Sequence, residues 1–178
     1  QILTHYPETI QIAKTITSQE AALDTRQSST IFIPELAKDI LEQIVFEARK
    51  SEFVDVKSGV SARLSITAFE NLVSTAERRL LHSGDDKTGI RMSDFIGIIP
   101  AITGKIELVY EGEQEGAYSV ALTLLGSAIK TLYSKYFPKI EKLEKQGVET
   151  PYDEIVSWFF NTSDDFEILD DIQEKDYK

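Results

Sequence analysis

The sequence predicts an all-α fold: a helical bundle with a long additional C-terminal helix, an acidic tail and at most one short strand or hairpin. Three segments repeat apolar residues at spacings of three and four, as amphipathic helices do, namely 34–51, 67–83 and 116–137. One segment, 105–110 (KIELVY), has the alternation of a strand, and it has no obvious partner strand. With 178 residues and 42% hydrophobic content, the chain can bury a sizeable core.

The first two helices are predicted from proline positions. Pro7 opens a helix that runs to about Leu23, because proline suits the first turn of a helix. Residues 24–33 are polar and then β-branched, which predicts a loop ending in a short extended piece. Pro34 starts the second helix, whose apolar stripe faces inward while its charged residues face out.

The third helix follows the turn 57–63 (KSGVSAR). Thr67 and Glu70 match a capping box, in which each side chain satisfies a free backbone donor at the start of a helix. Gly84 supplies the stop signal. After a polar turn, Ser93 is expected to cap a short helix that proline and glycine limit at about residue 104.

The last third of the chain combines a long helix with excess negative charge. Residues 110–116 (YEGEQEG) are expected as a solvated loop before that helix, although their glutamates also suit a cation or a basic partner surface. Proline opens a final short helix at 151, and residues 139–178 carry 12 acids against 5 lysines. We therefore divide the chain into a helical domain (1–104), a connecting segment with the long helix (105–138) and an acidic extension (139–178).

Composition excludes several classes of function. The formal charge of -11 argues against a nucleic-acid surface, because phosphate binding requires a clustered basic face. The absence of cysteine excludes disulfides, thiolate catalysis and cysteine zinc sites. No apolar run reaches the roughly 18 to 20 residues that span a bilayer, so we expect no membrane partner and a cytoplasmic location.

Catalytic and metal motifs are missing from the sequence. His5 and His82 lie in different helical segments without carboxylates at ligand spacing, which predicts no metal site. No Gly-x-Ser-x-Gly nucleophile turn occurs. The dipeptide at 104–105 fails as a P-loop, because Ile99 and Ile106 stand where glycine and a hydroxyl residue are needed. We expect no catalytic residue in this chain.

One stretch resembles a known family. Residues 57–66 (KSGVSARLSI) with 68–79 (AFENLVSTAERR) resemble the lid segment that carries the sensor 2 arginine in AAA+ ATPases of the magnesium chelatase I-subunit and MoxR clade. Three further stretches support the resemblance: QILTHYPETIQIA, IPELAKDILEQIVFEARKS and ITGKIELVYEGEQEG. It spans about residues 1–137 and is most specific at SGVSAR. In the family the P-loop, Walker B acids and sensor 1 precede this region, and this chain contains none of them.

The resemblance implies a role for Arg63. In such ATPases the lid covers the nucleotide, and the sensor 2 arginine reaches phosphate oxygens, with Ser58, Gly59 and Ser61 forming the supporting turn here. It also implies ATP and Mg²⁺ in a full-length parent, with neither bound tightly by this piece. The implied partners are the chain's own AAA+ core, neighbouring subunits of a homo-oligomeric ring, expected to be a hexamer, and a protein of von Willebrand A type. The implied outcome is metal insertion or partner remodelling.

Each arginine also has a simpler interpretation. Arg63 could pair with Glu47 or Asp55, or cover apolar surface with its stem. Arg78 and Arg79 could line the same subunit interface or belong to a solvated face of the third helix.

A function of another class stays open. The chain could be a freestanding helical interaction module that docks a basic protein through its acidic C-terminal region. Trp158, Phe159 and Phe160 would then be an apolar anchor, whereas their simpler interpretation is core for the last helix.

Overall fold

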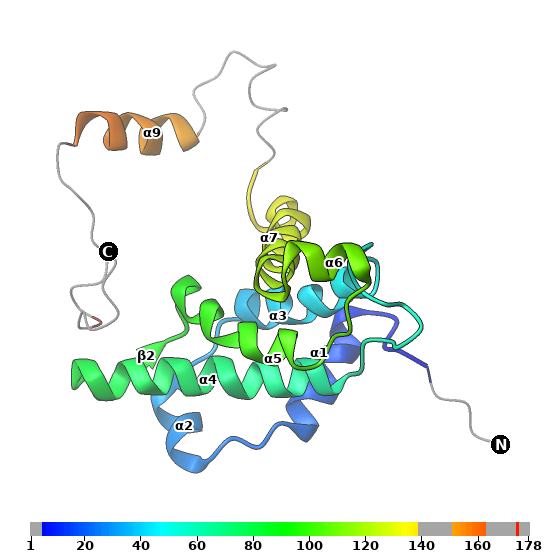
Figure 1. Cartoon of the computed structure of the whole chain (residues 1–178). Helices are drawn as coiled ribbons and strands as arrows, with labels where there is room; N and C mark the ends of the chain where they lie inside the picture. The colour runs from blue at the N-terminus through cyan, green and yellow to red at the C-terminus, as the bar shows by residue number, and fades with distance from the viewer. Residues whose placement is uncertain (1–4, 139–150, 163–173, 175–178) are drawn as a thin grey trace.

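The computed structural model describes residues 5–138, 151–162 and Glu174 (Figure 1). Most of these residues are helical, which confirms the all-α prediction. In chain order the elements are α1 (Ile10–Glu20), α2 (Thr25–Thr30), β1 (Ile31–Phe32), α3 (Glu35–Ala48), α4 (Arg63–Ser83), β2 (Thr88–Gly89), the 3-10 helix η1 (Met92–Ile98), α5 (Ile99–Thr103), α6 (Tyr110–Glu115), α7 (Ala117–Tyr136) and α9 (Pro151–Asn161).

Helix α3 forms the centre of the bundle. It packs most extensively against α7 and also contacts α1 and α4. In the view of Figure 1, α7 lies above α3 and α4 runs below it. The apolar stripe predicted for the second helix is buried, including Ile40, Leu41, Ile44 and Val45. Burying such side chains in a contiguous core is the main favourable term for the fold.

Helix α4 begins earlier than the sequence indicated. It starts at Arg63, so Thr67 and Glu70 lie inside the helix and the predicted capping box is wrong. The reason is tertiary: Leu64 and Ala68 are buried, so the apolar face extends one turn further toward the N-terminus. The Glu70 carboxylate instead accepts a hydrogen bond from the backbone N–H of Ala22 at 2.9 Å.

The predicted stop of that helix is confirmed. Gly84 caps α4 with φ 71°, in the left-handed region that favours glycine. The first helix is shorter than predicted, because Thr9 rather than Pro7 caps it, accepting from the Ile12 N–H. Ser93 is not a cap either: η1 begins after Arg91.

The segment 24–33 contains more structure than a loop. Asp24 and Gln27 form a capping box that starts α2, a helix that the sequence analysis missed. The extended piece after it is confirmed as β1, which pairs in parallel with β2 through Ile31↔Thr88 and Phe32↔Gly89. Among the described residues, this pair is the only sheet.

The predicted strand and loop near residue 110 are largely wrong. Within the predicted strand 105–110, the sole pairing is one antiparallel bridge between Leu108 and Val54. The run expected as a loop is helix α6, because Gly112 packs against the Phe53 carbonyl, where an added Cβ would lie 2.4 Å from the oxygen. Helices α7 and α9 confirm the last two predicted helices. The acidic tail lies outside the described residues apart from α9, Thr162 and Glu174.

Two buried carboxylates on α3 join the surrounding helices. Asp39, 1% exposed, accepts hydrogen bonds from Lys14 of α1 at 2.6 Å, from the Tyr136 hydroxyl of α7 at 2.6 Å, and from Lys135. Glu42 accepts from the Thr17 hydroxyl of α1 at 2.5 Å and from the Ser65 hydroxyl of α4 at 2.7 Å. These contacts set the relative positions of α1, α3 and α7.

The pKa values of the Asp39 and Glu42 carboxyl groups are shifted in opposite directions. Burial opposes ionisation of Asp39, but the hydrogen bonds from Lys135, Lys14 and Tyr136 lower its pKa to about 2. Glu42 lacks a charged donor at hydrogen-bond distance among the described residues, and its contacts are with the Thr17 and Ser65 hydroxyls. Burial therefore raises the pKa of Glu42.

Asp39→Asn is expected to lower the free energy of unfolding at pH 7 by about 2 kcal/mol, because Lys14, Lys135 and Tyr136 lose the buried carboxylate that they share. The Asp39 pKa falls from 3.8 to about 2 on folding, so its contribution is complete above about pH 4 and is lost as pH falls toward 2. Urea unfolding at several pH values measures this. Asp86→Asn, at an exposed turn residue, is the control, and an equal loss in both variants would contradict the role given to Asp39.

Candidate functional site

The turn before α4 is anchored to the bundle through Val60. The Arg49 guanidinium donates from Nε and Nη2 to the Val60 carbonyl, both at 3.2 Å. The Val60 N–H donates to the Tyr6 hydroxyl at 3.1 Å, and the Arg49 guanidinium stacks on the Tyr6 ring at 4.2 Å from its centroid. Both backbone groups of this buried residue are therefore held by side chains.

The three residues predicted to support the turn each have a structural task. Gly59 has φ 73°, and a Cβ there would lie 2.3 Å from the Tyr6 hydroxyl oxygen, so both conformation and space require glycine. The Ser58 hydroxyl donates to the Glu107 carboxylate. The Ser61 Oγ accepts from the backbone N–H of Arg63 at 3.2 Å.

Arg63 is the first residue of α4, and its side chain is exposed. The two acids considered as its partners bind elsewhere. Glu47 accepts from Gln43 at 2.6 Å and from the Thr131 hydroxyl at 3.0 Å. Asp55 accepts from the Lys57 N–H at 2.8 Å. Within the described parts of the chain, no carboxylate lies within ion-pair distance of the Arg63 guanidinium, which is presented to solvent from an anchored turn.

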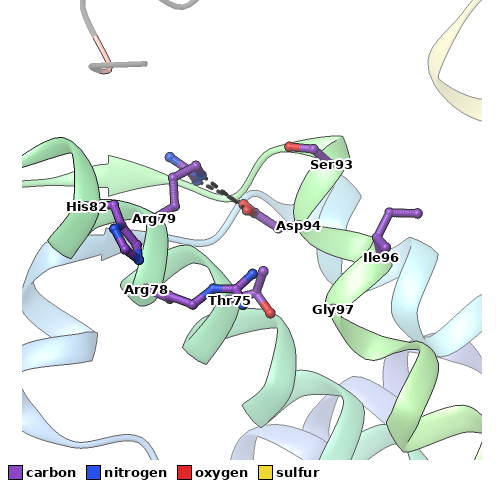
Figure 2. Close-up of a pocket in the computed structure, with 8 residues that line it drawn as sticks. All are labelled: Thr75, Arg78, Arg79, His82, Ser93, Asp94, Ile96 and Gly97. Carbon is purple, nitrogen blue, oxygen red and sulfur yellow. Dashed lines mark hydrogen bonds and ion pairs between the residues drawn. The ribbon is translucent and has the colours of Figure 1, made fainter. Parts of the chain in front are cut away.

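A second candidate site lies at the other end of the same helix. A cavity of about 600 Å³ separates the C-terminal half of α4 from η1 (Figure 2). Its lining consists of Thr75, Arg78, Arg79, His82, Ser93, Asp94, Ile96 and Gly97. The two walls approach each other closely at Thr75 and Gly97, where a Cβ on Gly97 would lie 2.0 Å from the Thr75 Oγ1.

Adjacent arginines play different parts in this cavity. Arg79 is 5% exposed and donates to both carboxylate oxygens of Asp94, at 3.2 and 2.9 Å (Figure 2). It also donates to the Thr88 hydroxyl at 2.6 Å and to the Gly89 carbonyl at 2.7 Å. Arg78 is exposed. The interpretation of a solvated helix face is therefore wrong for Arg79, which joins α4 to β2 and η1.

The cavity has the donors of an anion site. Arg78 and His82 bring exposed nitrogen donors, and Ser93 adds a hydroxyl beside the Arg79–Asp94 pair. A rise of about 1.5 Å per residue places Arg63 about 22 Å along the helix from Arg78, so the two sites cannot share one phosphate. Residue types in the sequence pointed to both arginines but not to the cavity, because the second wall of the cavity comes from η1.

The final aromatic cluster is not core. Trp158, Phe159 and Phe160 of α9 are 51%, 58% and 86% exposed, so their interpretation as core for the last helix is wrong. Ile155 and Val156 of the same helix are also exposed.

Metal centres and membrane-spanning helices are both absent from the described residues. There, no three His, Asp or Glu side chains converge in a way that could hold a metal ion. None of the helices described combines the length and the apolar character needed to cross a bilayer.

No family model, curated protein or solved structure matches this chain. The resemblance of residues 57–66 to the chelatase clade is therefore a hypothesis that rests on the sequence pattern alone.

Arg79→Met is expected to lower the free energy of unfolding by about 3 kcal/mol, because it leaves the buried Asp94 carboxylate without its bidentate partner. Arg78→Met is the matched control, since it makes the same chemical change at the neighbouring exposed position and should cost less than about 0.5 kcal/mol. Denaturant unfolding of both variants tests this difference. Equal destabilisation would show that Arg79 has no special structural part.

Proposed function

We propose that this chain is the nucleotide-sensing lid of a ring-forming AAA+ ATPase similar to magnesium chelatase I subunits, and that Arg63 is its sensor 2 arginine. The observation that carries the proposal is the exposed Arg63 guanidinium, which has no carboxylate partner among the described residues and projects from a turn anchored at Val60. An arginine held in this way is available to a ligand.

The chemistry of the guanidinium suits a terminal phosphate. It presents a planar fork of N–H donors that matches phosphate oxygens, and it keeps its charge at any physiological pH. Because Val60 and Gly59 hold the turn, little backbone freedom remains to be lost when Arg63 binds. Positive charge near the transferred phosphoryl group also stabilises the charge that spreads over its oxygens.

The residues of this chain fit one part of a nucleotide site. Arg63 suits phosphate oxygens, whereas the described residues offer no acidic cluster for Mg²⁺. The proposal therefore assigns the metal and the P-loop to an AAA+ core, expected N-terminal to this chain in the same polypeptide. When bound there, ATP supplies the phosphoryl group whose loss the lid would detect.

The fold offers a route from that contact to motion. Helix α4 has 21 residues, and at about 1.5 Å per residue it extends about 30 Å from Arg63 to its C-terminal end, with the cavity beside its second half. Its Ser65 hydroxyl donates to Glu42 at 2.7 Å, which joins the start of α4 to the central helix. Loss of the γ-phosphate would release Arg63 and allow the lid to rotate as one body against the core.

The remaining parts of the proposal concern the assembly. Its partners would be the AAA+ core and neighbouring subunits of a homo-oligomeric ring, with a hexamer expected, and a protein of von Willebrand A type as client or adaptor. The work done by the ring would be metal insertion or protein remodelling in the cytoplasm.

In the complete ATPase that carries this chain, Arg63→Ala is expected to reduce kcat for ATP hydrolysis on the order of 10³-fold, because the charge near the phosphoryl group is lost. Arg63→Lys should recover only part of the activity, since an ammonium lacks the fork. The control is Arg26→Ala, which removes an exposed arginine of α2. Wild-type turnover by Arg63→Ala would rule out the sensor role, and so would the lack of any P-loop polypeptide joined to or assembled with this chain.

A second function is favoured by the exposed apolar face of α9. Phe160 and Ile155 lie on a helix whose first turn carries Asp153 and Glu154. Apolar anchors beside acidic side chains suit a partner with basic residues around an apolar patch. The chain would then be an interaction module that docks a basic protein.

Phe160→Ser tests this second function with an amphipathic Lys/Leu peptide as the probe. Titration should shift the fluorescence of Trp158, the only tryptophan of the chain, and the substitution should weaken the binding about tenfold through loss of one apolar anchor. Phe32→Ser, at an exposed position of β1, is the control. Equal affinity of wild type and Phe160→Ser would contradict docking through α9.

A further inference from the structure

The corner formed by the end of α4, β2 and η1 contains two buried guanidinium groups. Arg79 and Arg91 are each 5% exposed, and Thr88 between them is equally buried. Asp94 accepts two hydrogen bonds from Arg79 and one from the backbone N–H of Arg91 at 2.7 Å. Charged groups are costly to bury without partners, so the direction of their other donors indicates what the corner binds.

Three donor groups of this corner, one hydroxyl and two guanidinium nitrogens, converge on one carboxylate oxygen. The Glu174 Oε2 accepts from the Thr88 hydroxyl at 2.7 Å and from the Arg91 Nη2 at 3.0 Å, and the Arg79 Nη1 lies 3.5 Å away. The backbone N–H of Glu174 donates to the Asp85 carboxylate at 2.8 Å. This is a charge-assisted arrangement around a single carboxylate.

The donor side of the corner is built without Glu174. Thr88 belongs to β2, which pairs with β1, and its hydroxyl accepts from Arg79 while donating to Glu174. Such a chain of hydrogen bonds polarises the donor and strengthens its bond to an anion. Arg79 is held by Asp94 and by the Gly89 carbonyl. The positions of Thr88 and Arg79 are therefore set by contacts within the bundle.

Glu174 differs from the residues that hold it. Its side chain is 41% exposed, whereas theirs are buried, so the carboxylate reaches the donors from the solvent side. Burial alone would raise the pKa of Glu174, but the hydrogen bonds from Thr88 and Arg91 and the nearby guanidinium charges lower it. The carboxylate stays ionised in this position, as an anion ligand should.

We propose that Thr88, Arg91 and Arg79 form a receptor for one carboxylate of an acidic peptide segment, and that Glu174 of the same chain fills it. The receptor binds Glu174 against the bundle and is exchangeable, because this occupant approaches from solvent. This goes beyond the lid function and does not depend on nucleotide. A glutamate from a second copy offers the same chemistry, and the experiment distinguishes the two sources.

The experiment uses the full chain and a synthetic peptide of residues 163–178. Calorimetric titration should show binding of the peptide to the Glu174→Gln chain and at least about tenfold weaker binding to wild type, where the tethered Glu174 competes at high effective concentration. Glu113→Gln removes the same charge from an exposed position of α6 and should behave as wild type. A peptide that carries Gln at position 174 should bind neither chain. Equal affinity for all chains, or no binding to Glu174→Gln, would overturn the proposal.

A second measurement identifies the source of the carboxylate. The Nε–H resonance of Arg91 in NMR spectra should shift in Glu174→Gln and should be independent of protein concentration in wild type. A wild-type shift that depends on concentration, together with Glu174-dependent association in sedimentation, would assign the carboxylate to a second copy and overturn the assignment to the same chain. An unchanged Arg91 resonance in Glu174→Gln would overturn the receptor itself.

Discussion

The arrangement of the bundle depends on two buried carboxylates of α3, Asp39 and Glu42. Asp39 is held by residues of α1 and α7, and Glu42 is held by residues of α1 and α4. Apolar burial supplies most of the favourable free energy, but it is non-directional. Hydrogen bonds to a buried carboxylate have a defined geometry, so these two side chains fix which turns of the neighbouring helices face α3.

This constraint reaches both candidate sites through α4. Ser65, which donates to Glu42, is two residues from Arg63, so the buried polar contact positions the exposed arginine. At the far end, Arg79 fixes the helix to β2 and η1 through Asp94 and Thr88. Helix α4 thus presents Arg63 to solvent at its start, whereas Arg79 near its end is buried and holds neighbouring elements together. A displacement of one end of α4 would therefore also move the other end, because the helix between them is packed into the core along one face.

Sequence patterns predicted the elements whose signals are local. Apolar periodicity identified α3 and α7, and Gly84 identified the end of α4. The failures arose where distant contacts decided the conformation. Gly112 lies in helix α6 because of its packing against Phe53, and α4 extends to Arg63 because its first turn buries Leu64, although Thr67 offered a better local cap.

The candidate sites show the same division. The turn at Gly59 was identified from residue types, since a glycine-opened turn before a helix is a local signal. Helical spacing places Arg79, three residues after Ala76, on the buried face of α4, but its partners Asp94 and Thr88 come from η1 and β2 and have no local signal. The contact of Glu174 with Thr88 joins residues 86 positions apart, which is beyond any periodicity argument.

The contact between Gly97 and Thr75 limits how the cavity beside Arg78 can change its shape. With no room for even a methyl group at that point, η1 cannot slide along α4 without a collision. The Arg79–Asp94 ion pair joins the same two walls at a second point. A guest would therefore have to fit the space as it stands, because moving the walls apart would break a buried ion pair.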